Sequence, residues 1–310
     1  MIDVEGVTRR FGDFTAVAKV DFRIAAGEIV GLLGHNGAGK TTLMKMITGY
    51  LAPSAGTIRV DGVSVSEDPR HAQARIGYLP ENCPLYPEMT VVEYLDFQAG
   101  LHGVPAGKRR AALRRAIRLT ELEPKALAPI RTLSRGYRQR VGVAQAILHE
   151  PRILILDEPT NGLDPNQILH MRRLIRDLAR EATVIVSTHI LQEVEAVCER
   201  VIILNAGRKV VDARLDELRR SRGLELVVDR PPEALTPVLA GLDGVGEVKL
   251  LDATEGRYRY RLDAAPDLAP AVAGAVQQAG FALHGLCPER RDLESLFAEV
   301  TRGGEVRDVA

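Results

Sequence analysis

Two acidic residues, Asp157 and Glu158, follow directly after the apolar residues 153–156. A run of consecutive apolar residues is typical of a parallel strand that is buried on both faces, so these charges stand where such a strand leaves the core. One carboxylate at that position can hold a divalent cation, and its neighbour can polarise a water molecule. The pair therefore indicates a hydrolytic site at the end of a buried strand.

A second chemical motif lies earlier in the chain, in residues 34–41, which read GHNGAGKT. Glycine, any four residues, glycine, lysine and threonine form the P-loop pattern. Its glycines let backbone N–H groups face phosphates, Lys40 can reach the outer phosphates, and the Thr41 hydroxyl can ligate Mg²⁺. The apolar residues 28–33 predict a strand that enters the loop, and residues 42–47 predict a helix that leaves it. The chain is thus predicted to bind a nucleoside triphosphate.

A third motif, LSRGYRQ at residues 133–139, precedes an apolar-periodic segment and predicts a helix N-terminus that faces phosphate. With it, residues 1–215 resemble the ATP-binding subunit of an ABC transporter. The order matches that family: P-loop, a glutamine-loop position at Glu81, this signature, the acidic strand, a D-loop at residues 161–164, and a switch histidine, His189. The wordings YLPEN, LYPEMTV, LSRGYRQR and LDPNQI further resemble the type-2 exporter ATPases grouped with gliding-motility ATP-binding proteins.

This resemblance implies an α/β P-loop fold with a mixed-sheet core, an antiparallel β subdomain and a helical subdomain at about residues 89–145. It implies catalysis by Glu158, His189 and Lys40, and Mg²⁺ binding by Thr41, Glu81 and Asp157. Contacts to ATP are implied for Phe11, Val17, Gly34, His35, Asn36, Gly37, Ala38, Gly39, Lys40, Thr41, Thr42 and Glu81. An alternative for Phe11 is an ordinary aromatic in a surface turn.

In the resembled family the signature closes over the ATP of a second subunit, so the resemblance implies a head-to-tail homodimer. Contacts to the partner's ATP are then expected from Ser134, Gly136, Tyr137 and Asp164. The chain departs from the usual pattern at three of its positions, because Glu81 stands for glutamine and Arg135 and Tyr137 stand for glycine and glutamine. A carboxylate at position 81 can still ligate a cation.

The composition is consistent with a water-soluble ATPase that reaches the membrane through another chain. The 310 residues predict two domains, and 41 basic against 41 acidic residues give zero net charge, so no nucleic-acid partner is expected. No apolar run is long enough to span a membrane, and the start is not a secretory signal. Three scattered cysteines indicate a reducing compartment and no zinc site. We therefore expect a cytoplasmic protein, held at the inner membrane by a separate permease.

The helical part begins with a predicted capping box at Thr90–Glu93, which opens a helix through Phe97, and continues with a second helix over residues 108–122. The many cations of this second helix are consistent with a solvated face, with a lipid or nucleic-acid contact, or with a contact to the permease.

After Asp212 a charged connector at residues 214–223 leads to a predicted order of strand, helix, strand, strand, helix, strand. These elements are expected at residues 224–228, 232–242, 245–251, 257–262, 268–279 and 281–287, with a final helix at 293–301. That order predicts a ferredoxin-like α+β accessory domain over residues 216–310. Residues 257–261, RYRYR, are interpreted as a strand with one polar face, against the alternative of an RNA contact.

Two other functions are alternatives to that of a transport ATPase. A non-transport ABC ATPase normally carries two motif sets or a coiled-coil insertion, and this chain has one set and no such insertion. A nucleotide-gated binding module without turnover requires a broken catalytic residue, and only Glu81 is ambiguous. The sequence does not define the cargo, because the cargo pocket of such a transporter lies in the permease.

Overall fold

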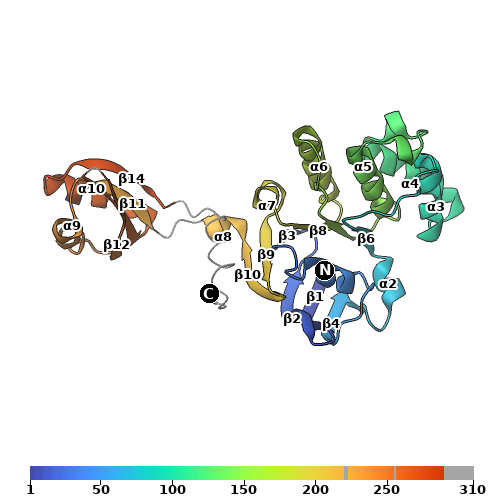
Figure 1. The fold of residues 1–310 in the computed structure, drawn as a ribbon, viewed down its shortest axis with the longest axis horizontal. Helices are drawn as coiled ribbons and strands as arrows, with labels where there is room; N and C mark the ends of the chain where they lie inside the picture. Colours follow the sequence, from blue (N-terminus) through green and yellow to red (C-terminus); the bar gives the residue numbers. More distant parts are fainter. Residues whose placement is uncertain (220–222, 255, 290–310) are drawn as a thin grey trace. The chain divides into compact units, whose positions relative to one another are not determined.

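The computed structural model describes residues 1–219, 223–254 and 256–289. They divide into two compact units, with the boundary between Leu215 and Asp216 (Figure 1). Each unit has its own cluster of buried apolar side chains. The motifs identified in the sequence all lie in the first unit, which positions the site.

A mixed six-stranded sheet forms the centre of the first unit. Its spatial order is β10 (Arg208–Arg214), β9 (Arg200–Asn205), β3 (Ile29–Leu33), β8 (Thr183–Thr188), β7 (Ile153–Asp157) and β6 (Ile76–Leu79). All neighbours are parallel except β10, which is antiparallel to β9. Every residue of β7 and β8 is buried, which explains their unbroken apolar runs. The mixed sheet predicted from the sequence is confirmed, and the carboxyl ends of its parallel strands meet at one edge.

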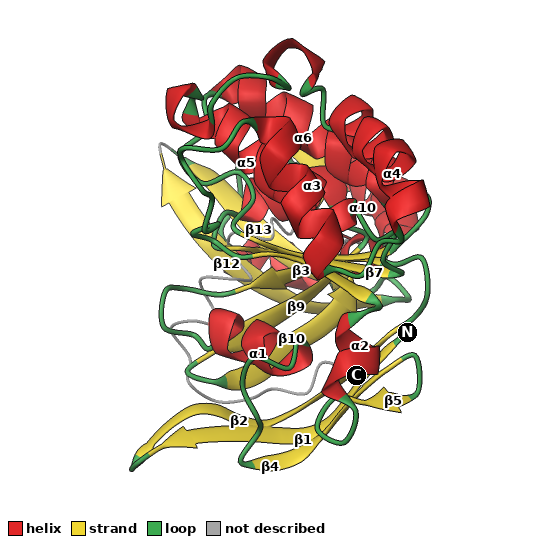
Figure 2. Ribbon diagram, turned by 90° about the vertical axis from the view of Figure 1, so that its right-hand side faces the viewer, coloured by secondary structure: helices red, strands yellow, loops and turns green. Residues whose placement is uncertain are grey.

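An antiparallel sheet and a helix complete the core of this unit. The sheet has the order β2 (Phe14–Ile24), β1 (Ile2–Phe11), β4 (Ala55–Val60) and β5 (Val63–Ser64), and a short helix α2 (Pro69–Gln73) follows it. Helix α1 (Lys40–Ile47) lies between this sheet and the mixed sheet (Figure 2). Its side chains Leu43, Met44, Met46 and Ile47 are buried in a cluster that contains residues of both sheets. This packing holds the amino-terminal end of α1 against the edge where the parallel strands end.

The first unit has further helices, some in contact with the mixed sheet and some packed against those helices. They are α3 (Val91–Leu101), α4 (Ala106–Leu119), η1 (Glu123–Lys125), η2 (Ile130–Thr132), α5 (Arg135–Ile147), α6 (Pro165–Leu178) and α7 (Leu191–Val197).

The predicted capping box is confirmed: Thr90 Oγ1 accepts from the Glu93 N–H at 3.3 Å, and Glu93 Oε2 accepts from the Thr90 N–H at 2.8 Å. Helix α3 runs past its predicted end at Phe97, and α4 ends before Leu122 because Thr120 takes the C-cap position.

Two histidines stack where α5 meets β6. His149 follows α5, and its Nε2 lies 3.1 Å from the carbonyl oxygen of Ile76. Its ring is nearly parallel to that of His102, with centroids 4.3 Å apart. Burial lowers the pKa of His149 to about 4, and His102 acts in the same direction. The fold therefore keeps this imidazole neutral at pH values where the unfolded chain would protonate it.

Acidification from about pH 7.5 to about pH 5 is expected to lower the free energy of unfolding by about 2 kcal/mol through His149. The pKa is lower in the folded state, so the unfolded state binds its proton first as the pH falls, and stability is lost between the ordinary pKa of 6.5 and about 4. Urea denaturation of the wild type and of His149→Gln at both pH values measures this change in the free energy of unfolding. The variant is expected to lose about 2 kcal/mol less than the wild type, and equal losses would contradict the shifted pKa.

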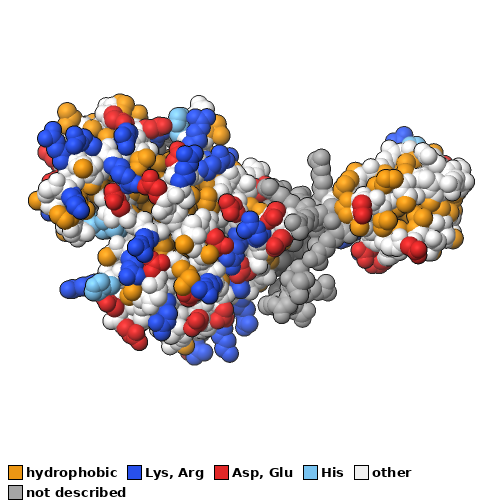
Figure 3. All heavy atoms as spheres, turned by 180° about the vertical axis from the view of Figure 1, so that it is seen from behind, with side chains coloured by type: hydrophobic (Ala, Val, Ile, Leu, Met, Phe, Trp, Pro, Cys, Tyr) orange, Lys and Arg blue, Asp and Glu red, His pale blue; other side chains and the backbone are white. Residues whose placement is uncertain are grey.

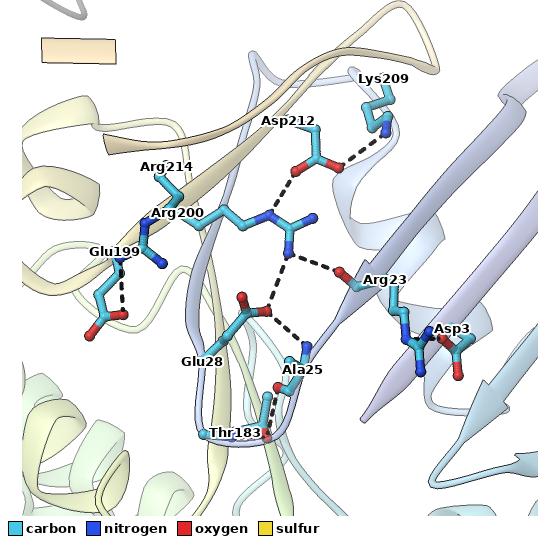
Figure 4. Close-up of polar contacts among 11 residues, drawn as sticks. Asp3, Arg23, Ala25, Glu28, Thr183, Glu199, Arg200, Lys209, Asp212 and Arg214 are labelled. Carbon is cyan, nitrogen blue, oxygen red and sulfur yellow. Dashed lines mark hydrogen bonds and ion pairs between the residues drawn. The ribbon is translucent and has the colours of Figure 1, made fainter. Parts of the chain in front are cut away.

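Figure 4 shows the polar contacts at the opposite, amino-terminal edge of the mixed sheet. The Arg200 guanidinium donates from Nε to Asp212 Oδ1 at 2.7 Å, and from Nη1 to the Arg23 carbonyl at 2.9 Å and to Glu28 Oε2 at 3.2 Å. The same Glu28 oxygen accepts from the Ala25 N–H at 2.8 Å. The hydrogen bond to Asp212 is the main cause that raises the pKa of Arg200. One half-buried cation thus joins β9, β10 and the turn between β2 and β3.

The second unit is a four-stranded antiparallel sheet with helices on one face. Helix α8 (Leu215–Arg219) spans the boundary between the two units. The elements of the second unit after it are β11 (Leu224–Val228), α9 (Pro232–Leu239), β12 (Val245–Thr254), β13 (Arg257–Ala264), η3 (Pro266–Leu268), α10 (Ala269–Gln278) and β14 (Leu283–Pro288). The sheet order is β12-β13-β11-β14. Strand, helix, strand, strand, helix, strand in this order confirms the predicted ferredoxin-like topology. The helix expected at 293–301 lies outside the described residues, and part of the expected connector forms α8.

Alternation along β11 and β13 separates a buried face from a polar one. Tyr260 and Leu262 pack with Leu226 in the core of the second unit, whereas Arg257 and Arg259 are exposed. The Tyr260 hydroxyl donates to the Arg230 carbonyl at 2.7 Å. The tyrosines of the RYRYR segment therefore belong to the core, as the interpretation of a strand with one polar face requires.

The face of the first unit that Figure 3 draws carries charges of both signs. On the face of the first unit in Figure 3, Lys and Arg side chains are interspersed with Asp and Glu side chains, in keeping with the zero net charge. Across the described residues, none of the helices has both the length and the apolar character that a membrane crossing demands.

Candidate active site

The P-loop joins β3 to α1 in a tightly packed turn. Gly39 has φ +102°, and a Cβ at this position would lie 2.6 Å from the Ala16 carbonyl oxygen, so neither the backbone angle nor the space admits another residue. Lys40 begins α1 and folds back over the loop, donating from Nζ to the Gly34 carbonyl at 2.6 Å and to the His35 carbonyl at 3.3 Å. The N-terminus of α1 thus presents its free N–H groups beside a buried ammonium group.

The acidic pair lies at the same edge of the sheet, at the end of β7. Asp157 Oδ2 accepts from the Thr41 hydroxyl at 3.3 Å, which joins β7 to the P-loop helix. Glu158 Oε1 lies 3.9 Å from Lys40 Nζ. The ring Nδ1 of His189 lies 3.0 Å from each Glu158 carboxylate oxygen. Five residues from three distant segments therefore meet around one point.

Glu158 is held in an uncommon backbone conformation. Its φ is +49°, in the left-handed region, and its N–H donates to the Ser187 carbonyl of β8 at 2.9 Å. A non-glycine residue in this region carries strain that the surrounding structure must offset. The side chain is buried, with 6% of the residue exposed. The turn therefore directs a desolvated carboxylate towards the P-loop.

Burial sets the protonation of the charged groups here. It raises the pKa of Asp157 to about 6, with the charges of Glu158 and Glu81 acting in the same direction. Burial also lowers the pKa of Lys40, and the carboxylates of Glu158, Asp157 and Glu81 oppose that shift. Carboxylates packed this closely favour a cation among them.

The donor set around Asp157 fits Mg²⁺. Asp157 Oδ1 is buried and has no hydrogen-bond partner within the described chain, and a buried carboxylate oxygen without a partner is costly. The Thr41 hydroxyl lies next to the other oxygen of the same carboxylate. Hard oxygen ligands of this type are those that Mg²⁺ prefers.

A cavity of about 420 Å³ opens beside these groups. Its lining contains His35, Asn36, Gly37, Gly39, Lys40, Thr41, Thr42, Glu81, Glu158 and His189, all of which the sequence had indicated, together with Phe14, Ala16 and Asn161. Such a volume is in the range of small-molecule sites. Segments far apart in the sequence, such as β2 and the residues after β8, thus line the same cavity.

Other predicted nucleotide contacts lie outside this lining. Val17 is fully buried, and Ala38 is 5% exposed. Gly34 contributes its carbonyl to Lys40. Phe11 is 47% exposed, with the Arg9 guanidinium 4.6 Å from its ring centroid. Its cross-strand partner in the β1–β2 hairpin is Phe14, the aromatic that lines the cavity.

The sequence did not indicate Phe14 and Ala16, and it placed Asn161 in the D-loop without a contact to this cavity. A signal for the first two was present, because Phe14 and Ala16 alternate on one face of β2 directly after the Gly12–Asp13 turn. Asn161 donates from Nδ2 to Glu81 Oε1 at 3.4 Å, so the exposed Glu81 is tied to the D-loop at the cavity wall. That contact depends on the sheet order and has no local signal.

The helix starts at the signature and after the D-loop are in contact, and the predicted residues there do not line the cavity. Ser134 caps α5, its Oγ accepting from the Tyr137 N–H at 3.4 Å, and Asp164 caps α6, its Oδ1 accepting from the Gln167 N–H at 2.9 Å. A Cβ on Gly136 would lie 2.6 Å from the Gln167 amide, so the two helix starts are in close contact. Ser134, Gly136, Tyr137 and Asp164 are all absent from the cavity lining.

The two departures in the signature also have partners. The Arg135 guanidinium lies against Gly162, where a Cβ would be 2.4 Å from it and where φ is +70°. The Tyr137 ring has Arg140 at 5.6 Å and Lys125 at 5.9 Å from its centroid. Such contacts to cations suit an aromatic ring. The substituted side chains therefore fit this fold.

Comparison with known proteins agrees with this geometry. The ABC transporter family matches residues 17–161. The "Nod factor export ATP-binding protein I" of Ralstonia nicotianae is 37% identical over 220 residues, which are 70% of this chain and 68% of that protein. The protein of the same name from Paraburkholderia xenovorans is 37% identical over 270 residues, 86% of this chain and 87% of that protein.

Solved structures are similar as well. A structure described as the ATP-binding subunit of an ABC transporter superposes with a TM-score of 0.65 and 32% identity, over 71% of this chain and 92% of that one. An ATP-binding cassette solved as a dimer in a post-hydrolysis state with ADP and Pi has a TM-score of 0.63 and 26% identity, over 69% of this chain and 99% of that one. The chain therefore belongs to the ATP-binding, ATP-hydrolysing subunits of ABC transporters.

Proposed function

We propose that this subunit hydrolyses ATP in the cavity beside Lys40, with Glu158 polarising the attacking water. One observation carries this proposal: the buried Glu158 carboxylate contacts His189 and also lies 3.9 Å from Nζ of the P-loop residue Lys40. Lys40 neutralises charge on the outer phosphates, and His189 donates a hydrogen bond to the terminal phosphate. Phosphoryl transfer depends mainly on such positioning and charge stabilisation.

The nucleotide lies with its phosphates on the P-loop and its base beside the β1–β2 hairpin. Backbone N–H groups of residues 35–42 receive the phosphates, because they surround a helix N-terminus. The exposed ring of Phe14 at the cavity wall supports a place for adenine there, with Phe11 as its cross-strand neighbour. Val17, buried behind the P-loop, shapes the pocket floor.

Thr41 and Asp157 hold Mg²⁺ in this proposal, and Glu81 contributes from the cavity wall. When bound, the ion neutralises charge on the phosphates. The unpartnered Asp157 Oδ1 supports this assignment, since a cation would satisfy it. The carboxylate at position 81 keeps an oxygen ligand where the family usually has glutamine.

Transport requires two copies of this chain and a membrane partner. Ser134, Gly136, Tyr137 and Asp164 act on the ATP of a second copy, which the separation of the signature from the cavity supports. ATP closes the dimer and hydrolysis reopens it. A separate permease couples that motion to cargo and holds the protein on the cytoplasmic face of the inner membrane. The export named for the relatives supports an exporter, without defining the cargo.

Residues 1–215 form the ATP-binding domain in this proposal, and residues 216–310 form an accessory domain. The boundary between the two compact units supports this division. The P-loop, acidic pair and switch histidine all precede residue 216. The accessory domain carries none of these motifs and is assigned a regulatory or dimer-bracing role.

Mixing two inactive variants tests whether each site combines two chains. Glu158→Gln removes the carboxylate of a chain's own site, and Ser134→Arg fills the place of the partner's phosphate. Their heterodimer keeps one intact composite site, so random mixing is expected to restore about a quarter of wild-type ATPase activity. A mixture no more active than the two variants alone would contradict the pairing in trans.

A further inference from the structure

Glu193 is a buried carboxylate behind the catalytic cavity. It lies in the first turn of α7 and is 5% exposed. Its Oε2 accepts hydrogen bonds from the Thr160 hydroxyl and from the Thr188 hydroxyl, the latter at 3.2 Å. Both threonines are themselves buried. Hydrogen bonds to a charged acceptor are stronger than neutral ones, especially in a site without water.

The two threonines belong to the two segments that carry the catalytic pair. Thr160 lies two residues after Glu158 and directly before Asn161, which lines the cavity. Thr188 ends β8 directly before His189, and its hydroxyl also accepts from the Ile190 N–H at 3.1 Å. One carboxylate therefore joins the turn after β7 to the turn after β8.

We propose that Glu193 is a positioning residue for ATP hydrolysis, which fixes Glu158 and His189 relative to each other. This rests on the catalytic role proposed for Glu158. Glu193 is not part of the cavity lining, so it acts through the two turns. Glu158 needs such support, because its left-handed backbone conformation persists only where surrounding contacts determine it.

The P-loop does not depend on this anchor. Lys40 and Thr41 belong to α1, which is held by its own packing between the two sheets. Removal of the Glu193 carboxylate therefore loosens the turns that carry Glu158 and His189 while leaving the nucleotide-binding helix in place. The expected signature is a loss in kcat with little change in the affinity for ATP.

Steady-state ATPase kinetics of Glu193→Ala, Glu193→Gln, Thr160→Val and Thr188→Val test this role. Rates are divided by the number of nucleotide-binding sites, measured by equilibrium binding of ATP, so that unfolded protein does not contribute. Glu193→Ala is expected to lower kcat about 30-fold with KM changed less than about twofold, because small misplacements of reacting groups are costly. Glu193→Gln keeps an oxygen for both hydroxyls and is expected to recover most of that loss.

Glu199→Gln is the matched control, an exposed glutamate just after the same helix, and is expected to keep wild-type kinetics. Should Glu193→Ala not fold, Thr160→Val decides the matter, with an expected loss in kcat of about 10-fold at unchanged KM. Values of kcat per binding site within twofold of wild type would overturn the proposal. Glu158→Gln, assayed in parallel, separates the role proposed for Glu193 from the catalytic role proposed for Glu158. If Glu158→Gln stays active, the proposed catalytic site itself fails.

Discussion

Replacement of Glu158 by glutamine is expected to lower the rate of ATP hydrolysis at least about 100-fold while changing the affinity for ATP less than about threefold. Glutamine has the same size, so it preserves the turn that the Glu158 N–H makes with the Ser187 carbonyl. It removes the negative charge that faces Lys40 and His189. Without that charge the water is not polarised, whereas the phosphates still bind to the P-loop.

Release of phosphate at saturating ATP and Mg²⁺ measures the rate, and equilibrium binding of ATP measures the affinity. The dimer of this variant is expected to accumulate with ATP, as light scattering after size-exclusion chromatography would detect. Glu88→Gln serves as control, because the Glu88 side chain is 85% exposed and lies in the turn before α3. Wild-type turnover in Glu158→Gln would remove Glu158 from the reaction.

Replacement of Lys40 by alanine is expected to weaken ATP binding at least about 100-fold and to abolish measurable turnover, since a buried charge that faces phosphate is worth several kcal/mol. Its ammonium group lies over the P-loop carbonyls of Gly34 and His35, where the outer phosphates bind. The folded state should tolerate this change. Burial lowers the pKa of Lys40, so the fold keeps the charge there at some cost in stability.

Lys45→Ala is the matched control, since Lys45 belongs to the same helix and is exposed. It removes an identical side chain outside the cavity and is expected to keep wild-type binding and turnover. Thermal unfolding without nucleotide checks that both variants are folded. Retention of ATP binding by Lys40→Ala, with normal unfolding, would contradict the assignment of the P-loop lysine.

Much of the first unit could be predicted because its local patterns are strong. The unbroken apolar run of β7 requires burial on both faces, and the structure buries the whole strand. The capping box at Thr90 and Glu93 is formed as predicted, because both hydrogen bonds lie within one turn of chain. Element ends were less accurate: α3 extends to Leu101, since nothing after Phe97 breaks the helix.

The cavity shows where such prediction stops. Phe11 was predicted to contact the nucleotide, and the aromatic in the lining is its cross-strand partner Phe14. Which of the two rings reaches the cavity depends on the register and twist of the β1–β2 hairpin, and three register shifts occur between these strands. Glu193 had no signal at all, because its partner Thr160 lies in the turn after β7 and its partner Thr188 ends β8.

Residue types and spacing establish the kind of chemistry, because they define a P-loop with Lys40 and an acidic pair after a buried strand. That these groups meet follows only from the folded arrangement, with the Thr41 hydroxyl 3.3 Å from Asp157 and His189 3.0 Å from Glu158. Periodicity specifies each strand, whereas the neighbours of a strand depend on crossovers and packing. For this reason each motif could be identified from its own segment of sequence. The arrangement of the motifs in one site could not, because it depends on the order of the strands in the sheet.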